Sequence, residues 1–252
     1  MKLPVLSGID DFRQLRERGF TYIDRSLLVR TVLDHHGKLI RLSGPPRSGK
    51  SVSLSMLRCF FEAREENLSG LFVDLEIAQA GDRYIDEFQR YPVILLRLGW
   101  IGGAPWDDSW IAIREAIERA FHEHAYLLDS PELGEREIAD YRAILAGVAD
   151  RSLYESALLD LSRHLRLHHR EKVVVLIDDC NAEGRPRRLN DYKPEVLGFY
   201  RAFIDEGLKG NPHLFTVVLA GNLWGAEQTV AAALGSLEVK TLGPVDGSRI
   251  PQ

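Results

Sequence analysis

Four short apolar runs divide the chain, and longer stretches with helical periodicity separate them. The runs lie at residues 38–42, 92–98, 172–177 and 214–220. The run at 92–98 is nearly continuous in apolar residues, as is typical of a strand that is covered on both faces of its sheet. Because strands and helices alternate along the chain, the pattern predicts an α/β fold with three layers, α/β/α, around a mostly parallel central sheet.

Apolar side chains recur every three or four residues between these runs, which is typical of amphipathic packing helices. The expected helices cover residues 10–18, 22–34, 51–61, 135–145, 153–167 and 194–208, together with one that begins at Asp107 or Asp108. We expect Gly19 to close the first helix in a left-handed conformation and Asp24 or Ser26 to be the N-cap of the second. The tail is expected to hold a short helix at 227–234 and a strand at 237–242.

Composition narrows the class of protein. Hydrophobic residues make up 45% and charged residues 27% of the 252 residues, which excludes disorder as the main state. The 32 Lys and Arg against 37 Asp and Glu give a net charge of -5, which argues against a protein that coats nucleic acid by bulk charge. Two cysteines cannot build a disulfide framework, the N-terminus lacks the apolar segment of a signal peptide, and no apolar run is long enough to span a membrane. We therefore expect a cytoplasmic protein without a membrane partner.

One glycine-bearing segment carries a specific chemical pattern. Residues 44–51, GPPRSGKS, match G-x-x-x-x-G-K-[ST], and they follow an expected strand and open an expected helix. Glycines let the backbone wrap a phosphate closely, amide groups at the helix N-terminus bind its charge, and the lysine reaches the β- and γ-phosphates. The expected nucleotide-binding residues are Gly44, Pro45, Pro46, Arg47, Ser48, Gly49, Lys50, Ser51 and Val52. A chance glycine-rich turn is the alternative, and the strand-loop-helix context disfavours it.

Two acids follow the strongest apolar run. Asp178 lies where P-loop NTPases place the acid of the Mg²⁺ site, so Ser51 and Asp178 are the expected metal ligands. Asp179 is the candidate general base or water-orienting group, and Asn222 is a candidate contact of the γ-phosphate or the attacking water. A solvated strand end and a loop-capping Asn are the plain alternatives. We expect the phosphate loop and the acids to meet at the carboxyl edge of neighbouring strands.

Further stretches match a known family in combination and in order. They are residues 9–12, 15–17, 22–26, 45–61, 71–72, 91–94, 175–179 and 208–211. With these stretches the chain resembles the AAA-ATPase-like proteins of prokaryotic mobile and defence-associated genes. The resemblance implies an ATP-binding P-loop domain of the additional-strand type with ATP and Mg²⁺ as cofactors, usually followed by a nuclease-like domain of the PD-(D/E)xK kind.

The chain departs from the family pattern at several positions. Gly44 and Pro46 stand where the family has arginines, which leaves a generic phosphate loop. Asp179 replaces the usual Glu and is about 1.5 Å shorter in reach, so hydrolysis is expected to be slow. Ala220 replaces the usual Thr. The chain ends at Gln252, too soon after residues 214–220 for a nuclease domain, so we expect the ATPase module alone or a truncated reading frame.

These observations predict an N-terminal helical segment at residues 1–35, packed on a P-loop ATPase domain at residues 36–252. The expected reaction is Mg²⁺-dependent ATP hydrolysis, in which Lys50 stabilises developing charge and Asp179 orients the water. One alternative is a nucleotide-binding switch or scaffold with little turnover, acting on a separate nuclease or partner. A small-molecule kinase is a third interpretation, but no lid pattern supports it. A homo-oligomer and a nucleic-acid partner are weaker expectations.

Three further groups of residues have both a functional and a structural interpretation. The groups are the arginines Arg185, Arg187 and Arg188, the pair His164 and His168, and the tryptophans Trp100, Trp106 and Trp110. The arginines would serve as an arginine finger for a neighbouring subunit or contact nucleic acid, the histidines would bind a metal, and the tryptophans would form a partner surface. We favour a solvated loop for the arginines, the polar face of a helix for the histidines and core packing for the tryptophans.

Overall fold

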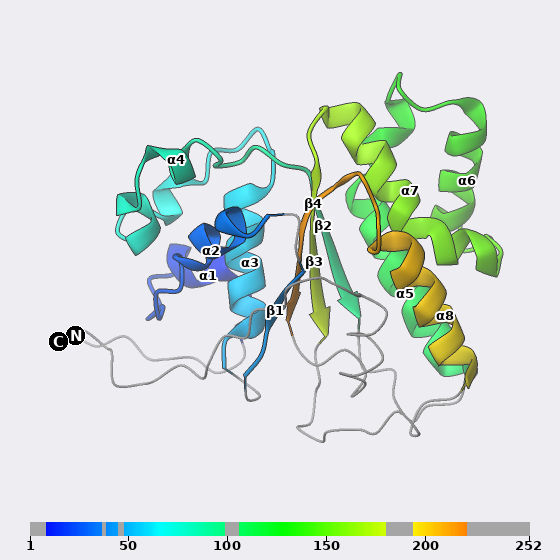
Figure 1. The fold of residues 1–252 in the computed structure, drawn as a ribbon, viewed down its shortest axis with the longest axis horizontal. Helices are drawn as coiled ribbons and strands as arrows, with labels where there is room; N and C mark the ends of the chain where they lie inside the picture. The colour runs from blue at the N-terminus through cyan, green and yellow to red at the C-terminus, as the bar shows by residue number, and fades with distance from the viewer. Residues whose placement is uncertain (1–8, 37–38, 45–47, 99–105, 180–193, 221–252) are drawn as a thin grey trace.

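Four parallel strands form the centre of the protein. The computed structural model describes residues 9–36, 39–44, 48–98, 106–179 and 194–220. Its sheet consists of β1 (Leu39–Leu42), β2 (Val93–Leu98), β3 (Val173–Asp179) and β4 (Leu214–Ala220). The strands pair in the order β1-β4-β3-β2, and every pairing is parallel (Figure 1). The four strands and the parallel sheet that the sequence predicts are therefore confirmed.

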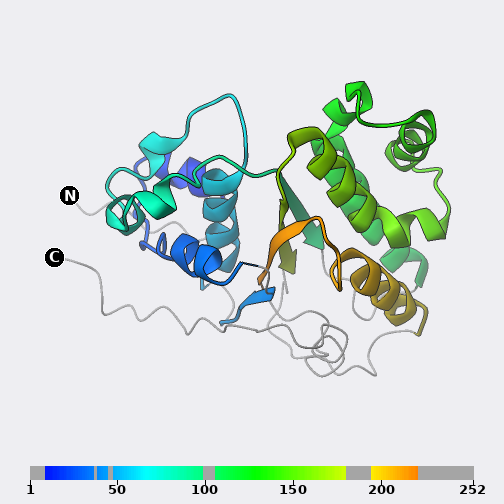
Figure 2. The same ribbon diagram turned by 45° about the horizontal axis from the view of Figure 1, so that its top comes forward.

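Helices cover both faces of this sheet (Figures 1 and 2). One layer holds α1 (Phe12–Glu17), α2 (Leu28–Asp34), α3 (Lys50–Phe61) and α4 (Asp82–Ile85), with the short 3₁₀ helices η1 (Ser69–Leu71) and η2 (Glu76–Gln79). The other layer holds α5 (Trp106–Glu123), α6 (Glu135–Leu145), α7 (Arg151–His169) and α8 (Pro194–Gly207), with η3 (Ala125–Asp129). The three-layer α/β/α architecture is confirmed.

The alternation of side chains along each strand explains the two layers. In β2, Val93 and Leu95 pack into the core on the α3 side, whereas Ile94 and Leu96 pack into the core on the α5 side. Successive residues of a strand point to opposite faces, so a strand that is buried twice must be apolar at nearly every position. The apolar runs in the sequence are the direct signature of this double burial.

The strand order corrects one expectation. β1 and β3 are not neighbours, because β4, the last strand in the sequence, lies between them and pairs with both. Leu42 and Asp178 each lie in register with Ala220. All carboxyl ends still meet at one edge, because the strands are parallel. A strand inserted at this place is what the resemblance to an additional-strand P-loop domain implied.

The start of α2 corrects a second expectation. Leu27 is the N-cap, and it makes no side-chain capping bond. The Asp24 carboxylate instead accepts hydrogen bonds from the amides of Ser26 (2.7 Å) and Glu76 (2.8 Å). The buried Ser26 hydroxyl accepts one from the amide of Ile77 at 3.1 Å. Both side chains therefore bind η2, an element without apolar periodicity that the sequence did not predict. Gly19 has a φ of 67°, as expected.

Two of the secondary candidate groups are partly described. His164 is only 3% exposed, so the expectation that it lies on a polar helix face is wrong, while His168 Nδ1 lies 2.9 Å from the Ser130 hydroxyl. Trp110 packs edge-on against Tyr154 and Phe199, with ring centroids 5.4 and 5.2 Å away. Core packing is therefore right for Trp110. Trp100, the side chain of Trp106, the three arginines and the expected tail elements lie outside the described residues.

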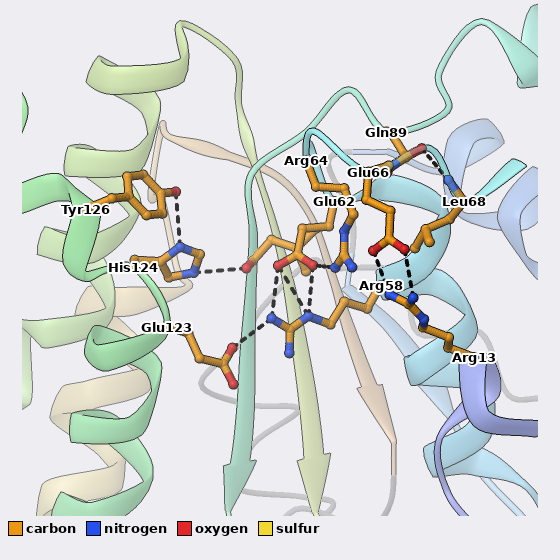
Figure 3. Close-up of polar contacts among 11 residues, drawn as sticks. Arg13, Arg58, Glu62, Arg64, Glu66, Leu68, Gln89, Glu123, His124 and Tyr126 are labelled. Atoms are coloured by element: carbon orange, nitrogen blue, oxygen red, sulfur yellow. Dashed lines mark hydrogen bonds and ion pairs between the residues drawn. The ribbon is translucent and has the colours of Figure 1, made fainter.

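A polar network joins the two layers at the amino edge of the sheet (Figure 3). At the end of α3, Arg58 Nη2 lies 3.0 Å from Glu62 Oε1 and 2.9 Å from Glu123 Oε2, and Arg64 also contacts Glu62. The neighbouring His124 places Nε2 at 3.1 Å from the carbonyl oxygen of Val93. Helix α3 is thus anchored to α5 at the end away from its first residue, Lys50, and His124, which follows α5, is in turn bound to β2.

None of the helices in the described ranges combines the length and the hydropathy that crossing a membrane requires.

Candidate functional site

The loop between β1 and α3 is shaped by two glycines. Gly49, the N-cap of α3, has a φ of 82°, a left-handed conformation that costs other residues free energy. A Cβ on Gly44 would lie 2.9 Å from Ser48 Oγ, so a larger residue there would displace the Ser48 side chain. The backbone can therefore make the close turn that the sequence pattern predicts. Pro45, Pro46 and Arg47 lie outside the described residues.

Lys50 folds back over this loop. Its Nζ donates a hydrogen bond to the Gly44 carbonyl oxygen at 2.9 Å and lies 3.4 Å from Ser48 Oγ. Lys50 is also the first residue of a twelve-residue helix whose first turn contains no acidic residue. Amide groups and the helix dipole make such an N-terminus favourable for an anion. The ammonium group and the helix start together provide positive charge at one place.

The helix start and the end of β3 meet directly. The Ser51 hydroxyl donates a hydrogen bond to Asp178 Oδ1 at 3.2 Å, although the two residues are 127 positions apart. Asp178 is only 5% exposed, in contrast to most carboxylates. The first turn of α3 therefore lies against the end of β3, although β4 separates β1 from β3 in the sheet.

The oxygens of Ser51 and Asp178 suit a hard cation. Mg²⁺ prefers oxygen ligands and is usually held by one or two protein groups, waters and the phosphates of a substrate. In the part of the chain that the structure describes, no group of three or more His, Cys, Asp or Glu forms a metal cluster of its own. The hydroxyl of Ser51 and the carboxylate of Asp178 are oxygen donors of the kind that such a cation takes from a protein.

Comparison with known proteins agrees with this geometry. A family model described as "Predicted AAA-ATPase" matches residues 6–226. The chain belongs to this AAA-ATPase-like family. The comparisons with curated proteins and with solved structures gave no match. The matched region includes all four strands, the phosphate loop and both acids of the AAA-ATPase-like protein.

The remaining predicted residues of the AAA-ATPase-like site are only partly described. Val52 follows Ser51 in α3 and is half-buried against the core on that side of the sheet. Asp179 ends β3, and its backbone lies in register with Leu98. The side chain of Asp179 and all of Asn222 lie outside the described residues, so their roles stay predictions.

Sequence reasoning missed two arginines near the site. Arg97 lies on β2 in register with Asp178, is exposed, and by strand alternation shares the α3 face with it. Its signal was the single charge in the run at 92–98. The Arg25 guanidinium lies near Gly49, since a Cβ on Gly49 would be 3.9 Å from its Cζ and its Nη1. Residues 22–26 were interpreted as a helix start and as a stretch that matches the family, and neither interpretation gave Arg25 a place in the site.

Ala220 marks a difference within the AAA-ATPase-like site. It is fully buried at the end of β4 and lies in register with Asp178 on one side and Leu42 on the other. A methyl group can neither donate nor accept a hydrogen bond. The position directly beside Asp178 therefore lacks the threonine hydroxyl that the family usually has there.

Proposed function

We propose that this protein binds ATP together with Mg²⁺ at the loop between β1 and α3 and hydrolyses the γ-phosphate. The observation that carries the proposal is the 3.2 Å contact between Ser51 and Asp178 at the start of α3. Membership of a family of predicted ATPases supports a general nucleotide-binding role. The choice of ATP rests on that family rather than on any base-specific residue.

The proposed roles follow from the sequence pattern and from the positions of Lys50, Ser51 and Asp178. The amides of the loop and of the α3 N-terminus bind the phosphate oxygens, and Lys50 stabilises the charge that develops on the β- and γ-phosphates. Ser51 and Asp178 hold the metal site, where Mg²⁺ would neutralise phosphate charge. Asp179 orients the attacking water, and Asn222 assists at the γ-phosphate. Catalysis of this kind consists of positioning and electrostatic stabilisation rather than covalent chemistry.

Substitution of Lys50 tests the proposal. Lys50→Ala should abolish ATP binding or turnover, because it removes the ammonium that faces the phosphates, whereas Asp179→Asn should keep binding and stop hydrolysis. Titration with a fluorescent ATP analogue and a phosphate-release assay measure the two properties separately. Lys209→Ala, which alters an exposed lysine after α8, is the control and should behave as wild type. Wild-type affinity in Lys50→Ala would overturn the assignment.

A nucleotide switch with little turnover is the second candidate function. Ala220, beside Asp178, favours it, because no hydroxyl is available there to hold a γ-phosphate or water. In this case the protein would retain ATP or ADP and regulate a separate nuclease or another partner. Phosphate release measured with and without DNA separates the candidates, since sustained release indicates an ATPase and tight retention without release indicates a switch. Mass measurement in the same solutions tests for a homo-oligomer.

A further inference from the structure

The segment before α2 places a cation against the phosphate loop. Gly49 is the residue that precedes Lys50, and a Cβ added to it would lie 3.9 Å from both Cζ and Nη1 of Arg25. A side chain at position 49 would therefore be in van der Waals contact with the Arg25 guanidinium, which places Arg25 next to the start of α3. Arg25 and Lys50 approach the same turn from different elements of the α3-side layer.

The backbone around Arg25 is held from both sides. Asp24 accepts hydrogen bonds from the amides of Ser26 and Glu76, at 2.7 and 2.8 Å. Ser26, which is fully buried, accepts one from the amide of Ile77 at 3.1 Å. The residues on either side of Arg25 are thus tied to η2, so the side chain starts from a fixed position rather than from a free loop.

Arg25 differs in its ion pairing from the arginines near it in the sequence. Arg13 pairs with Glu66, Arg16 with Asp74 and Arg30 with Asp34. Arg25 is half-buried, yet its side chain makes no ion pair and no hydrogen bond with any residue in the described ranges. Burial accordingly lowers the pKa of its guanidinium. A partly desolvated cation without a counter-ion is unfavourable, and an anion bound at the loop would relieve that cost.

We propose that Arg25 contacts a phosphate of the bound nucleotide and that nucleotide binding thereby restricts the motion of residues 24–26 and of η2. The inference rests on the proposed function, because it takes the ligand of the loop to be a nucleotide phosphate. It adds an arginine from outside the loop to the site. It also links the binding of nucleotide at the site to the segment formed by residues 24–26 and η2. Arg25 combines charge with a planar donor group that suits phosphate oxygens.

Competition binding tests the contact. ATP, tripolyphosphate and adenosine are each used to displace a fluorescent ATP analogue from wild type, Arg25→Ala, Arg25→Lys and the control Arg30→Ala, in which an exposed arginine of α2 is lost. Arg25→Ala should weaken the binding of ATP and of tripolyphosphate by a factor of about 10 to 100, which is the usual effect of losing a charged hydrogen bond. Arg25→Lys should recover part of the loss. The affinity of Arg25→Ala for adenosine should stay within about twofold of the wild-type value. The affinities of Arg30→Ala for all three ligands should likewise stay within about twofold of wild type.

Several outcomes would overturn the inference. The first is equal affinity for ATP in wild type and Arg25→Ala, and the second is a loss of adenosine affinity as large as the loss of ATP affinity. The third is a melting temperature of ligand-free Arg25→Ala lowered by more than about 5 °C, which would assign Arg25 a structural role. If wild type itself binds no nucleotide while folded, the proposed function fails first and the inference falls with it. If wild type binds nucleotide and Arg25→Ala binds it equally well, the inference is refuted while the proposed function stands.

Hydrogen exchange tests the link to η2. ATP should slow exchange of the Glu76 and Ile77 amides in wild type, because the bound phosphate fixes the segment to which they donate. The same nucleotide at saturating concentration should leave these amides unchanged in Arg25→Ala. Equal protection in both proteins would contradict the proposed link.

Discussion

At the scale of single residues, the carboxyl edge of the sheet is defined by a few contacts between distant positions. Ser51 meets Asp178, and Lys50 turns back onto Gly44. Sequence spacing identified these residue types, because the loop pattern and an acid after an apolar strand are both local signals. Arg97 gave only the single charge in the run at 92–98 and Arg25 gave no local signal, since their closeness to the site arises from strand register and packing.

A buried histidine makes stability depend on pH. His124 is 4% exposed, its Nε2–H donates to the Val93 carbonyl, and its Nδ1 lies 3.2 Å from the Tyr126 hydroxyl. Burial, with a smaller effect from the Arg58 guanidinium, lowers the pKa of His124 to about 4. The unfolded chain takes up a proton near pH 6.5, whereas the folded ring stays neutral, so acidification between about 6.5 and 4 favours unfolding.

The expected consequence is a loss of about 2 kcal/mol in unfolding free energy from His124 alone between pH 7 and pH 5. Urea unfolding at both pH values measures it. His124→Gln should show a correspondingly smaller difference between the two pH values, whatever its stability at pH 7. His122→Gln, which changes an exposed neighbour, should keep the wild-type difference. An unchanged pH dependence in His124→Gln would contradict the assignment.

At the scale of elements, doubly buried strands and long amphipathic helices were predictable, while short elements were not. The helix at 135–145 was predicted with its observed bounds. By contrast, η2 and α4 span four residues each, too few for a hydrophobic period to appear. Asp24 and Ser26 resemble helix caps, yet they bind η2, because tertiary partners competed with local ones. The order of the strands was likewise not predictable, because β4 inserts between β3 and β1, the first strand in the sequence.

The start of α3 gives a prediction at this scale. Gly49→Ala places a side chain at a φ of 82°, which should lower the unfolding free energy by about 1 to 2 kcal/mol and weaken ATP binding through distortion of the loop. Urea unfolding and ATP titration measure both effects. Gly70→Ala is a matched control, because a Cβ on Gly70 meets no atom within 4 Å. Wild-type stability in Gly49→Ala would show that the turn does not require a glycine.

At the scale of the whole molecule, the two edges of the sheet differ in character. The carboxyl edge brings the phosphate loop and Asp178 together, and the amino edge carries ion pairs between the layers. Arg58 reaches Glu62 on its own helix and Glu123 on α5, and these three side chains are between 12% and 28% exposed. Such partly buried pairs fix one layer against the other more firmly than exposed pairs do.

Arg58→Ala should therefore separate stability from binding. Loss of the guanidinium leaves Glu123 without this partner and should lower the unfolding free energy by about 1 to 3 kcal/mol. ATP affinity should stay within about twofold, because the site lies at the opposite edge of the sheet. Arg136→Ala, which alters an almost fully exposed arginine of α6, should change neither property. A large loss of affinity in Arg58→Ala would contradict the division between the edges.

The most direct test of the account is ATP binding by isothermal titration calorimetry, with and without Mg²⁺, for wild type and Asp178→Ala. The control is Asp86→Ala, which alters an exposed aspartate just after α4. We predict that Mg²⁺ strengthens ATP binding by more than about tenfold in wild type and in the control, and has little effect in Asp178→Ala. Equal strengthening by Mg²⁺ in wild type and Asp178→Ala would contradict the claim that Ser51 and Asp178 form a magnesium–nucleotide site.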